Sequence, residues 1–162
     1  IWKGNQNCFR LNRENVEALD ILTCSSFDLA VKFPNLTRIK IQIRNSAGSL
    51  KLGKFEKLTH LEIFQSDTIH DLTISATTKF IRMENYTFAE MPNFEHFQFE
   101  EIELIDCKNV GWLSEFLTKD ETSVKKLTIK ALEMSSEVFM VMLEHKSKVT
   151  KFNMNVDNIK FL

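Results

Sequence analysis

One apolar spacing recurs along almost the whole chain and restricts what it can fold into. In the stretch FEEIELIDCKN, Phe99, Ile102 and Leu104 are followed by Cys107, which is the spacing L-x-x-L-x-L-x-x-C with conservative replacements. Frames of this kind follow one another at intervals of about 20 to 25 residues. The three apolar positions of the other six are Val16, Leu19, Ile21; Leu36, Ile39, Ile41; Leu58, Leu61, Ile63; Thr78, Ile81, Met83; Val124, Leu127, Ile129; and Val149, Phe152, Met154. A period of this length is typical of architectures built by stacking one small unit on the next.

Each frame has the pattern of a short strand with one buried side. Its last two apolar residues alternate with polar ones, so they point to the same face of the strand. Parallel stacking of such strands builds a continuous core that no single unit could bury alone. We therefore predict an α/β fold with a parallel sheet on the concave face of a solenoid, formed by one domain over residues 1–162. Residues 1–14 would be an N-terminal cap, and about seven repeats would fill 15–162.

The segments between strands should return over the convex side in two ways. VGWLSEFL places Val110, Leu113 and Phe116–Leu117 on one helical face, and SSEVFMVMLEHK starts with serines that can cap a helix. We predict helices for these two segments. Earlier returns, such as QSDTIHDLTISATTK, are less regular and predict extended or 3₁₀ structure.

The three cysteines fit structural roles. Cys24 and Cys107 stand at the position after the strand, where regular repeats use Asn, and a buried Cys there is usually an inert small hydrophobe. They lie about four repeats apart, beyond the span of a disulfide. A Cys8–Cys24 disulfide could close an N-terminal cap if the chain is secreted, whereas all three thiols would be reduced in the cytosol.

Composition and motifs argue against several classes of function. The formal net charge is -1, which does not favour nucleic acid, and there is no apolar run long enough to span a bilayer. The four histidines are scattered and lack metal-ligand spacing, and neither a nucleophile-elbow motif nor a phosphate-binding Gly-rich loop is present. We expect a protein that is not an enzyme and that uses no cofactor or metal.

The frames resemble those of the leucine-rich-repeat superfamily, in an irregular form. The stretch LKLGKFEKLTHLEIFQSDTIHDLTISATTKFIRMENYTFAEMPNF has short repeats, a second small strand-like element at DLTI and a polar-aromatic turn at MENYTF. In these features it is similar to secreted insect leucine-rich-repeat immune proteins, the mosquito group that partners thioester-containing complement-like proteins. The resemblance implies an extracellular module of innate immunity that binds another protein in haemolymph. The cysteine-rich C-terminal cap and the coiled-coil tail of that group are missing here.

A second resemblance implies a different cellular location for the protein. The 25-residue repeat with a helix, VKKLTIKALEMSSEVFMVMLEHKSK, also looks like the repeats of F-box-type substrate receptors. It implies a cytoplasmic adaptor, although no F-box segment is present. Under the secreted interpretation the chain would be a glycoprotein, since Asn35 and Asn85 each begin an N-glycosylation sequon.

The outward strand positions are the candidates for partner binding. The middle row contains Lys40, Glu62, Arg82 and Glu103 on adjacent strands, a ladder of alternating charge whose simplest role is to offset like-charge repulsion. Apolar side chains flank this row and could anchor a partner, unless a loop covers them or the frame slips by one residue and turns them inward. Lys126, Lys130 and Lys151 should make the C-terminal end of the face basic. The complete set of predicted partner-binding residues is Lys40, Glu62, Phe64, Phe80, Arg82, Glu101, Glu103 and Ile105.

The end of the chain has no convincing cap. The last strand, VTKFNMNVDNIKFL, would leave an open sheet edge. The sequence therefore predicts truncation, an unusual terminal element or a subunit contact at this edge.

Overall fold

The computed structural model describes residues 2–3, 18–21, 33–42, 48–88, 97–119 and 122–161, and for 2–3, 18–21, 48–50 and 65–71 it describes the backbone only. The N-terminal half of the described chain contains strands alone: β1 (Trp2–Lys3), β2 (Ala18–Ile21), β3 (Arg38–Gln42), β4 (Gly48–Lys51), β5 (His60–Thr73) and β6 (Phe80–Phe88). The C-terminal half also contains helices: β7 (Gln98–Ile105), α2 (Trp112–Thr118), β8 (Ser123–Ser135), α3 (Ser136–Glu144), the 3₁₀ helix η2 (Lys146–Lys148) and β9 (Val149–Lys160).

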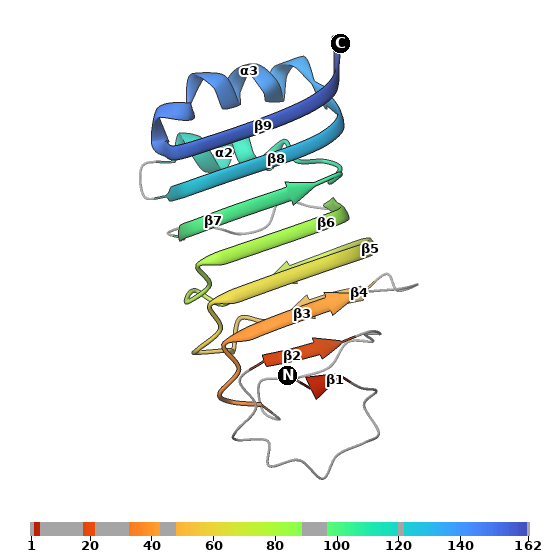
Figure 1. The fold of residues 1–162 in the computed structure, drawn as a ribbon, viewed down its shortest axis with the longest axis vertical. Helices are drawn as coiled ribbons and strands as arrows, with labels where there is room; N and C mark the ends of the chain where they lie inside the picture. The colour runs from red at the N-terminus through yellow and green to blue at the C-terminus, as the bar shows by residue number, and fades with distance from the viewer. Residues whose placement is uncertain are drawn as a thin grey trace.

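The strands form one sheet in which every pair is parallel. Their order in the sheet is β1-β2-β3-β5-β6-β7-β8-β9, and β4 pairs with the second half of β5 outside this path. Apart from β4, chain order and sheet order therefore agree, and each strand of this path lies beside the one before it (Figure 1). The predicted α/β class with a parallel sheet is confirmed.

The register of the sheet follows the seven sequence frames. The middle apolar positions form one continuous row across the sheet, and so do the last apolar positions. The first row is Leu19, Ile39, Leu61, Ile81, Ile102, Leu127 and Phe152, and the second is Ile21, Ile41, Ile63, Met83, Leu104, Ile129 and Met154. Because side chains alternate between faces, this register places the described side chains of the two rows, from β3 to β9, on the same side of the sheet.

The core lies between that inner face and the return segments. The first position of each frame for which a side chain is described is buried, with exposures between 0% and 6%. An aromatic series continues the core from the sheet to α2, with ring centroids 5.2 Å apart for Phe88 and Trp112 and 5.8 Å apart for Phe99 and Phe116. These large apolar areas are the main favourable contribution to the stability of the layer.

Both predicted helices are present. In α2, Leu113, Phe116 and Leu117 are buried as expected, and Trp112 adds a fourth buried side chain. In α3, the hydroxyl of Ser135 accepts a hydrogen bond from the backbone N–H of Val138, which satisfies one of the free amides of the first turn. Both helices contribute side chains to the core on the inner face, and Figure 1 shows α2 behind β8 and β9 and α3 beside β9 at the C-terminal end of the sheet. The predicted extended return is also found, since β5 continues through Thr73.

The position after the strand behaves in two different ways. Tyr86, which lies within β6, and Cys107, which follows β7, are both buried at this position of their frames, and the preceding residues, Asn85 and Asp106, adopt left-handed backbone angles with φ of 53° and 49°. These angles turn the chain inward, and Asn and Asp tolerate them better than most residues. At the corresponding position of the sixth frame, Leu132 is 63% exposed, because β8 continues through to Ser135.

Candidate protein-binding surface and a nearby pocket

The predicted partner-binding residues lie together on the outer face of the sheet, opposite the helices. The register places Lys40, Glu62, Arg82 and Glu103 side by side in one row. On one side of this row, Phe64 and Ile105 belong to a second row of residues in register across the strands. On the other side, a third row contains Phe80 and Glu101. We call these eight residues the recognition surface: Lys40, Glu62, Phe64, Phe80, Arg82, Glu101, Glu103 and Ile105.

The apolar members of the recognition surface are half-buried by their neighbours and do not turn inward. The ring of Phe80 stacks on that of His60, with centroids 4.3 Å apart and planes 10° from parallel. Lys40 Nζ lies 4.8 Å from the ring centroid of Phe64, and the guanidinium carbon of Arg82 lies 5.6 Å from it. Phe64 is thus held between two cations, which orient its ring and leave part of it open to solvent.

Ion pairs connect the central strands. Arg82 contacts Glu84 on its own strand at 3.2 Å and Glu103 on β7 at 3.5 Å. Glu101 accepts from Lys126 at 2.5 Å, and Glu103 also lies 4.0 Å from Lys130. These groups are exposed or partly exposed, so each pair adds little to stability, but together they fix the direction of the charged side chains.

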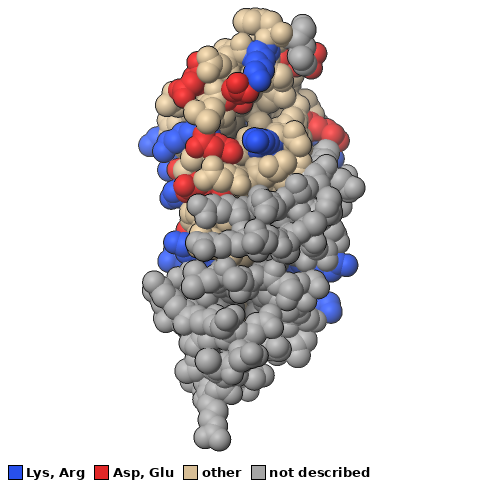
Figure 2. Space-filling view, turned by 90° about the vertical axis from the view of Figure 1, so that its right-hand side faces the viewer, with Lys and Arg blue, Asp and Glu red and all other residues tan. Residues whose placement is uncertain are grey.

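The charge pattern differs from the predicted ladder in two respects. Lys40 turns toward Phe64, and among the described residues it forms no ion pair with Glu62. The C-terminal end is less basic than predicted, because Glu101 and Glu103 offset Lys126 and Lys130. Figure 2 shows the side on which the strands end, and acidic and basic side chains are mixed over its described part.

His60, beside the recognition surface, has a pKa below its ordinary value. Its Nδ1 lies 2.8 Å from the hydroxyl of Thr59. Burial lowers the pKa of His60, and the positive charge of Arg38 lowers it further, while Glu62 acts in the opposite direction.

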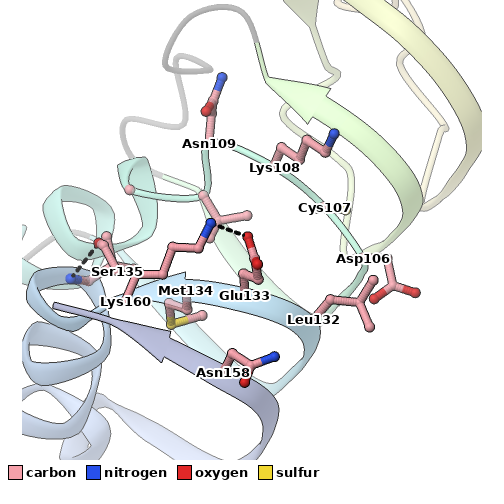
Figure 3. A pocket seen from close by; sticks show the side chains of 13 residues that line it. Asp106, Cys107, Lys108, Asn109, Leu132, Glu133, Met134, Ser135, Asn158 and Lys160 are labelled. Carbon is pink, nitrogen blue, oxygen red and sulfur yellow. Dashed lines mark hydrogen bonds and ion pairs between the residues drawn. The ribbon is translucent and has the colours of Figure 1, made fainter. Parts of the chain in front are cut away.

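A pocket lies where β7, β8 and β9 end. Its volume is about 700 Å³, and apolar side chains including Val110, Met134 and Val138 form part of its lining. Charged residues surround these, and Lys160 forms an ion pair with Glu133 at 2.5 Å (Figure 3). Sequence reasoning missed this pocket, because it depends on the unexpected extension of β8 past Leu132.

The thiol of Cys107 and the hydroxyl of Ser135, which line the pocket, are already engaged in structural roles. The thiol of Cys107 donates to the carbonyl oxygens of Met83 at 3.3 Å and Ile105 at 3.5 Å. Burial raises the pKa of Cys107 to about 11, so the thiol is protonated and a poor nucleophile at neutral pH. Ser135 caps α3. The lining therefore offers shape and charge for binding but no activated nucleophile.

The remaining predicted sites are only partly within the described chain. Cys8 and Cys24, the predicted disulfide, lie outside the described residues. Asn85 is exposed, so its side chain is accessible to modification, whereas Asn35 is half-buried and its Oδ1 accepts a hydrogen bond from Lys57 at 2.7 Å.

Within the described chain, no helix has the length and apolarity needed to cross a membrane, and no three metal-ligating side chains gather at one point. No protein-family model matches the sequence, and neither a curated protein nor a solved structure matches it.

Proposed function

We propose that this chain is an irregular leucine-rich-repeat solenoid of about seven repeats that recognises another protein and does not act as an enzyme. The observation that carries the proposal is the recognition surface: half-open aromatic rings and fixed charges on adjacent strands of a parallel sheet. The seven frames in register support the repeat assignment, because the strand of each frame lies beside the strand of the frame before it. Under this assignment the outer face is the concave face of the solenoid.

Phe64 and Arg82 are the anchors of the proposed contact. Aromatic and arginine side chains contribute a large share of the binding energy in protein interfaces, especially when neighbouring groups hold them in place. Here Lys40 and Arg82 hold Phe64, while Glu84 and Glu103 hold Arg82. A partner would thus meet a surface that loses little conformational entropy on binding.

The proposed setting is extracellular, as part of an innate-immune recognition system. Exposed Asn85 supports this setting, because a sequon must be accessible to carry a glycan. Protein from its native source should then lose mass when N-glycans are removed enzymatically. An unchanged mass together with three reduced cysteines would contradict secretion.

The binding proposal is tested by comparing capture of partners by matched variants. The chain is immobilised in insect haemolymph, and bound proteins are quantified for the wild type, Phe64→Ala and Arg82→Glu. Each substitution should weaken capture of a specific partner by roughly tenfold, the effect of removing an interface anchor. The fold should survive, because both side chains are partly exposed.

Two controls separate a local effect from a general one. Lys146→Glu reverses an exposed charge on η2, and Met140→Ala truncates a 53% exposed apolar side chain on α3. Both residues belong to the layer behind the sheet, so capture should be unchanged. Equal capture by all four variants and the wild type would remove the recognition surface as the binding site.

A further inference from the structure

Two exposed cations stand side by side on the outer face of β3. Arg38 and Lys40 occupy alternate positions of this strand, with buried Ile39 between them, so both side chains point away from the core. A strand rises about 3.3 Å per residue, which places the Cα atoms of the two cations about 7 Å apart. We call Arg38 and Lys40 the cationic pair.

The cationic pair is not engaged by carboxylates of the described chain. Among the described residues, neither Arg38 nor Lys40 forms an ion pair. Lys40 lies instead over the ring of Phe64, with its Nζ 4.8 Å from the ring centroid. On the β2 side, the register neighbour of Arg38 is an alanine, and that of Lys40 is Asp20, of which only the backbone is described. The guanidinium of Arg38 is thus an exposed charge that forms no ion pair with a described group.

The acids further along the outer face are already paired. The carboxylates on β6 and β7 form ion pairs with Arg82 of β6 and with lysines of β8. Glu62 of β5 is the described acid that lies closest in register to the cationic pair, beside Lys40. At the far end of the row that contains Arg38, Lys151 of β9 is a second exposed cation without an ion pair to a described residue. It therefore provides a matched control for the cationic pair.

His60 shows which charge dominates on this part of the face. It is the register neighbour of Arg38 on β5, and it stands two positions before Glu62 in the same strand. The positive charge of Arg38 lowers the pKa of His60, and this effect is larger than the opposite effect of Glu62. The electrostatic potential beside β3 is therefore positive despite Glu62, which favours a negatively charged partner.

We propose that the partner binds the β3 side of the recognition surface through an acidic segment. This acidic contact rests on the proposed function, since it specifies what the recognition surface binds. Aspartate or glutamate side chains at alternate positions of an extended segment have the same spacing as Arg38 and Lys40, so two carboxylates can meet two cations. An apolar side chain of the same segment can pack on the open part of Phe64, beside Lys40.

The test measures binding of three synthetic peptides to the full 162-residue chain by fluorescence anisotropy. The peptides share a central phenylalanine and differ only at the alternate positions that flank it, which are glutamate, glutamine or lysine. The glutamate peptide should bind about tenfold more tightly than the glutamine peptide, and the lysine peptide should bind most weakly. Because the cationic pair is exposed, raising the salt concentration should reduce this preference.

Charge-reversal variants locate the contact. Arg38→Glu and Lys40→Glu should each weaken binding of the glutamate peptide by about tenfold or more, because an attraction becomes a repulsion. Both side chains are exposed, so the fold should survive, which circular dichroism checks. Lys151→Glu makes the same change of charge on β9 and should bind the glutamate peptide like the wild type.

Several results would overturn the acidic contact. A glutamate peptide that binds no more tightly than the other two peptides contradicts it, and so does a loss in Lys151→Glu equal to the loss in Arg38→Glu. Binding of single-stranded DNA as tight as that of the glutamate peptide would indicate a general attraction of polyanions instead. Haemolymph capture that Phe64→Ala weakens and Arg38→Glu leaves unchanged would refute the acidic contact and leave the proposed function standing.

Discussion

At the scale of single residues, Cys107 illustrates how the chain leaves a strand. Its thiol donates to the carbonyl oxygens of Met83 and Ile105, and the left-handed angle of Asp106 directs it inward. In a regular repeat an Asn side chain would bind the backbone at this point. Cys107 replaces that amide with a smaller group that also packs as a hydrophobe.

The raised pKa of Cys107 predicts a loss of stability at alkaline pH. The thiol has a pKa of about 11 in the folded chain against an ordinary value of 9.0. Folding therefore favours the protonated form, so this contribution is complete below about pH 9 and is lost as the pH rises through about 11. Urea unfolding between pH 8 and 11 should show a fall of about 2 to 3 kcal/mol that comes from this group. Cys107→Ala should show a shallower pH dependence, and an identical dependence in both chains would contradict the assignment.

Thr78 is a residue at which the chain is expected to gain stability by substitution. It stands at an apolar position of its frame, it is 1% exposed, and its hydroxyl has no hydrogen-bond partner in the described structure. Thr78→Val keeps the shape and removes the buried unpaired oxygen, so the free energy of unfolding should rise by about 1 kcal/mol or more, or about 2 to 4 °C in Tm. Thr78→Ser keeps the hydroxyl and removes a methyl group, and it should lower Tm. A lower Tm for Thr78→Val would show that the hydroxyl is satisfied.

At the scale of elements, the helices depend on local signals that can be read in the sequence. The apolar spacing of VGWLSEFL and the serines of SSEVFMVMLEHK predict α2 and α3 correctly. Short-range periodicity is sufficient here, because the buried positions and the cap lie within a few turns of one another.

The Ser135 cap can be tested directly. Ser135→Ala removes the side chain that accepts from Val138 N–H, and it should lower the free energy of unfolding by about 0.5 to 2 kcal/mol. Thermal unfolding followed by circular dichroism measures the change. Ser136→Ala, one residue further on, is the matched control and should have little effect, so equal losses in the two variants would contradict the cap.

The lengths of the strands and the presence of the pocket could not be predicted from local sequence patterns. The sixth frame looks like the fifth, yet β7 ends at Ile105 while β8 continues past Leu132. That difference depends on pairing with β9, which extends as far as Ser135 and Lys160. The long-range contact thus overrides the local pattern, and it also forms the wall of the pocket.

The recognition surface was predictable in its register but not in its contacts. The frames correctly predict which side chains share a row, since the period of a strand is fixed. They do not show that Lys40 contacts the ring of Phe64, or that Lys126 forms an ion pair with Glu101. These contacts depend on side-chain rotamers and on distances across strands, which sequence spacing does not encode.

At the scale of the whole molecule, the proposed repeat assignment predicts that the destabilising effect of a core substitution stays local. In a solenoid each repeat contacts only its neighbours, so stability is close to a sum of units and interfaces. Leu127→Ala, at a fully buried position of β8, should cost about 2 to 5 kcal/mol. Native-state hydrogen exchange should then show reduced protection in β7, β8 and β9 and unchanged protection in β3 and the first half of β5. An equal loss across the whole sheet would contradict the repeat assignment.

The most direct test of the central claim is to place a photo-crosslinking residue on the recognition surface. Glu62 faces outward in the middle row between Lys40 and Arg82, whereas Lys146 is exposed in the layer behind the sheet. A benzophenone amino acid at each position, irradiated in insect haemolymph, reports which face a partner touches. We predict a discrete protein adduct from position 62 that disappears in the Phe64→Ala background, with no such adduct from position 146. Adducts from position 146 alone, or equal adducts from both positions, would contradict the claim that the outer face of the sheet binds another protein.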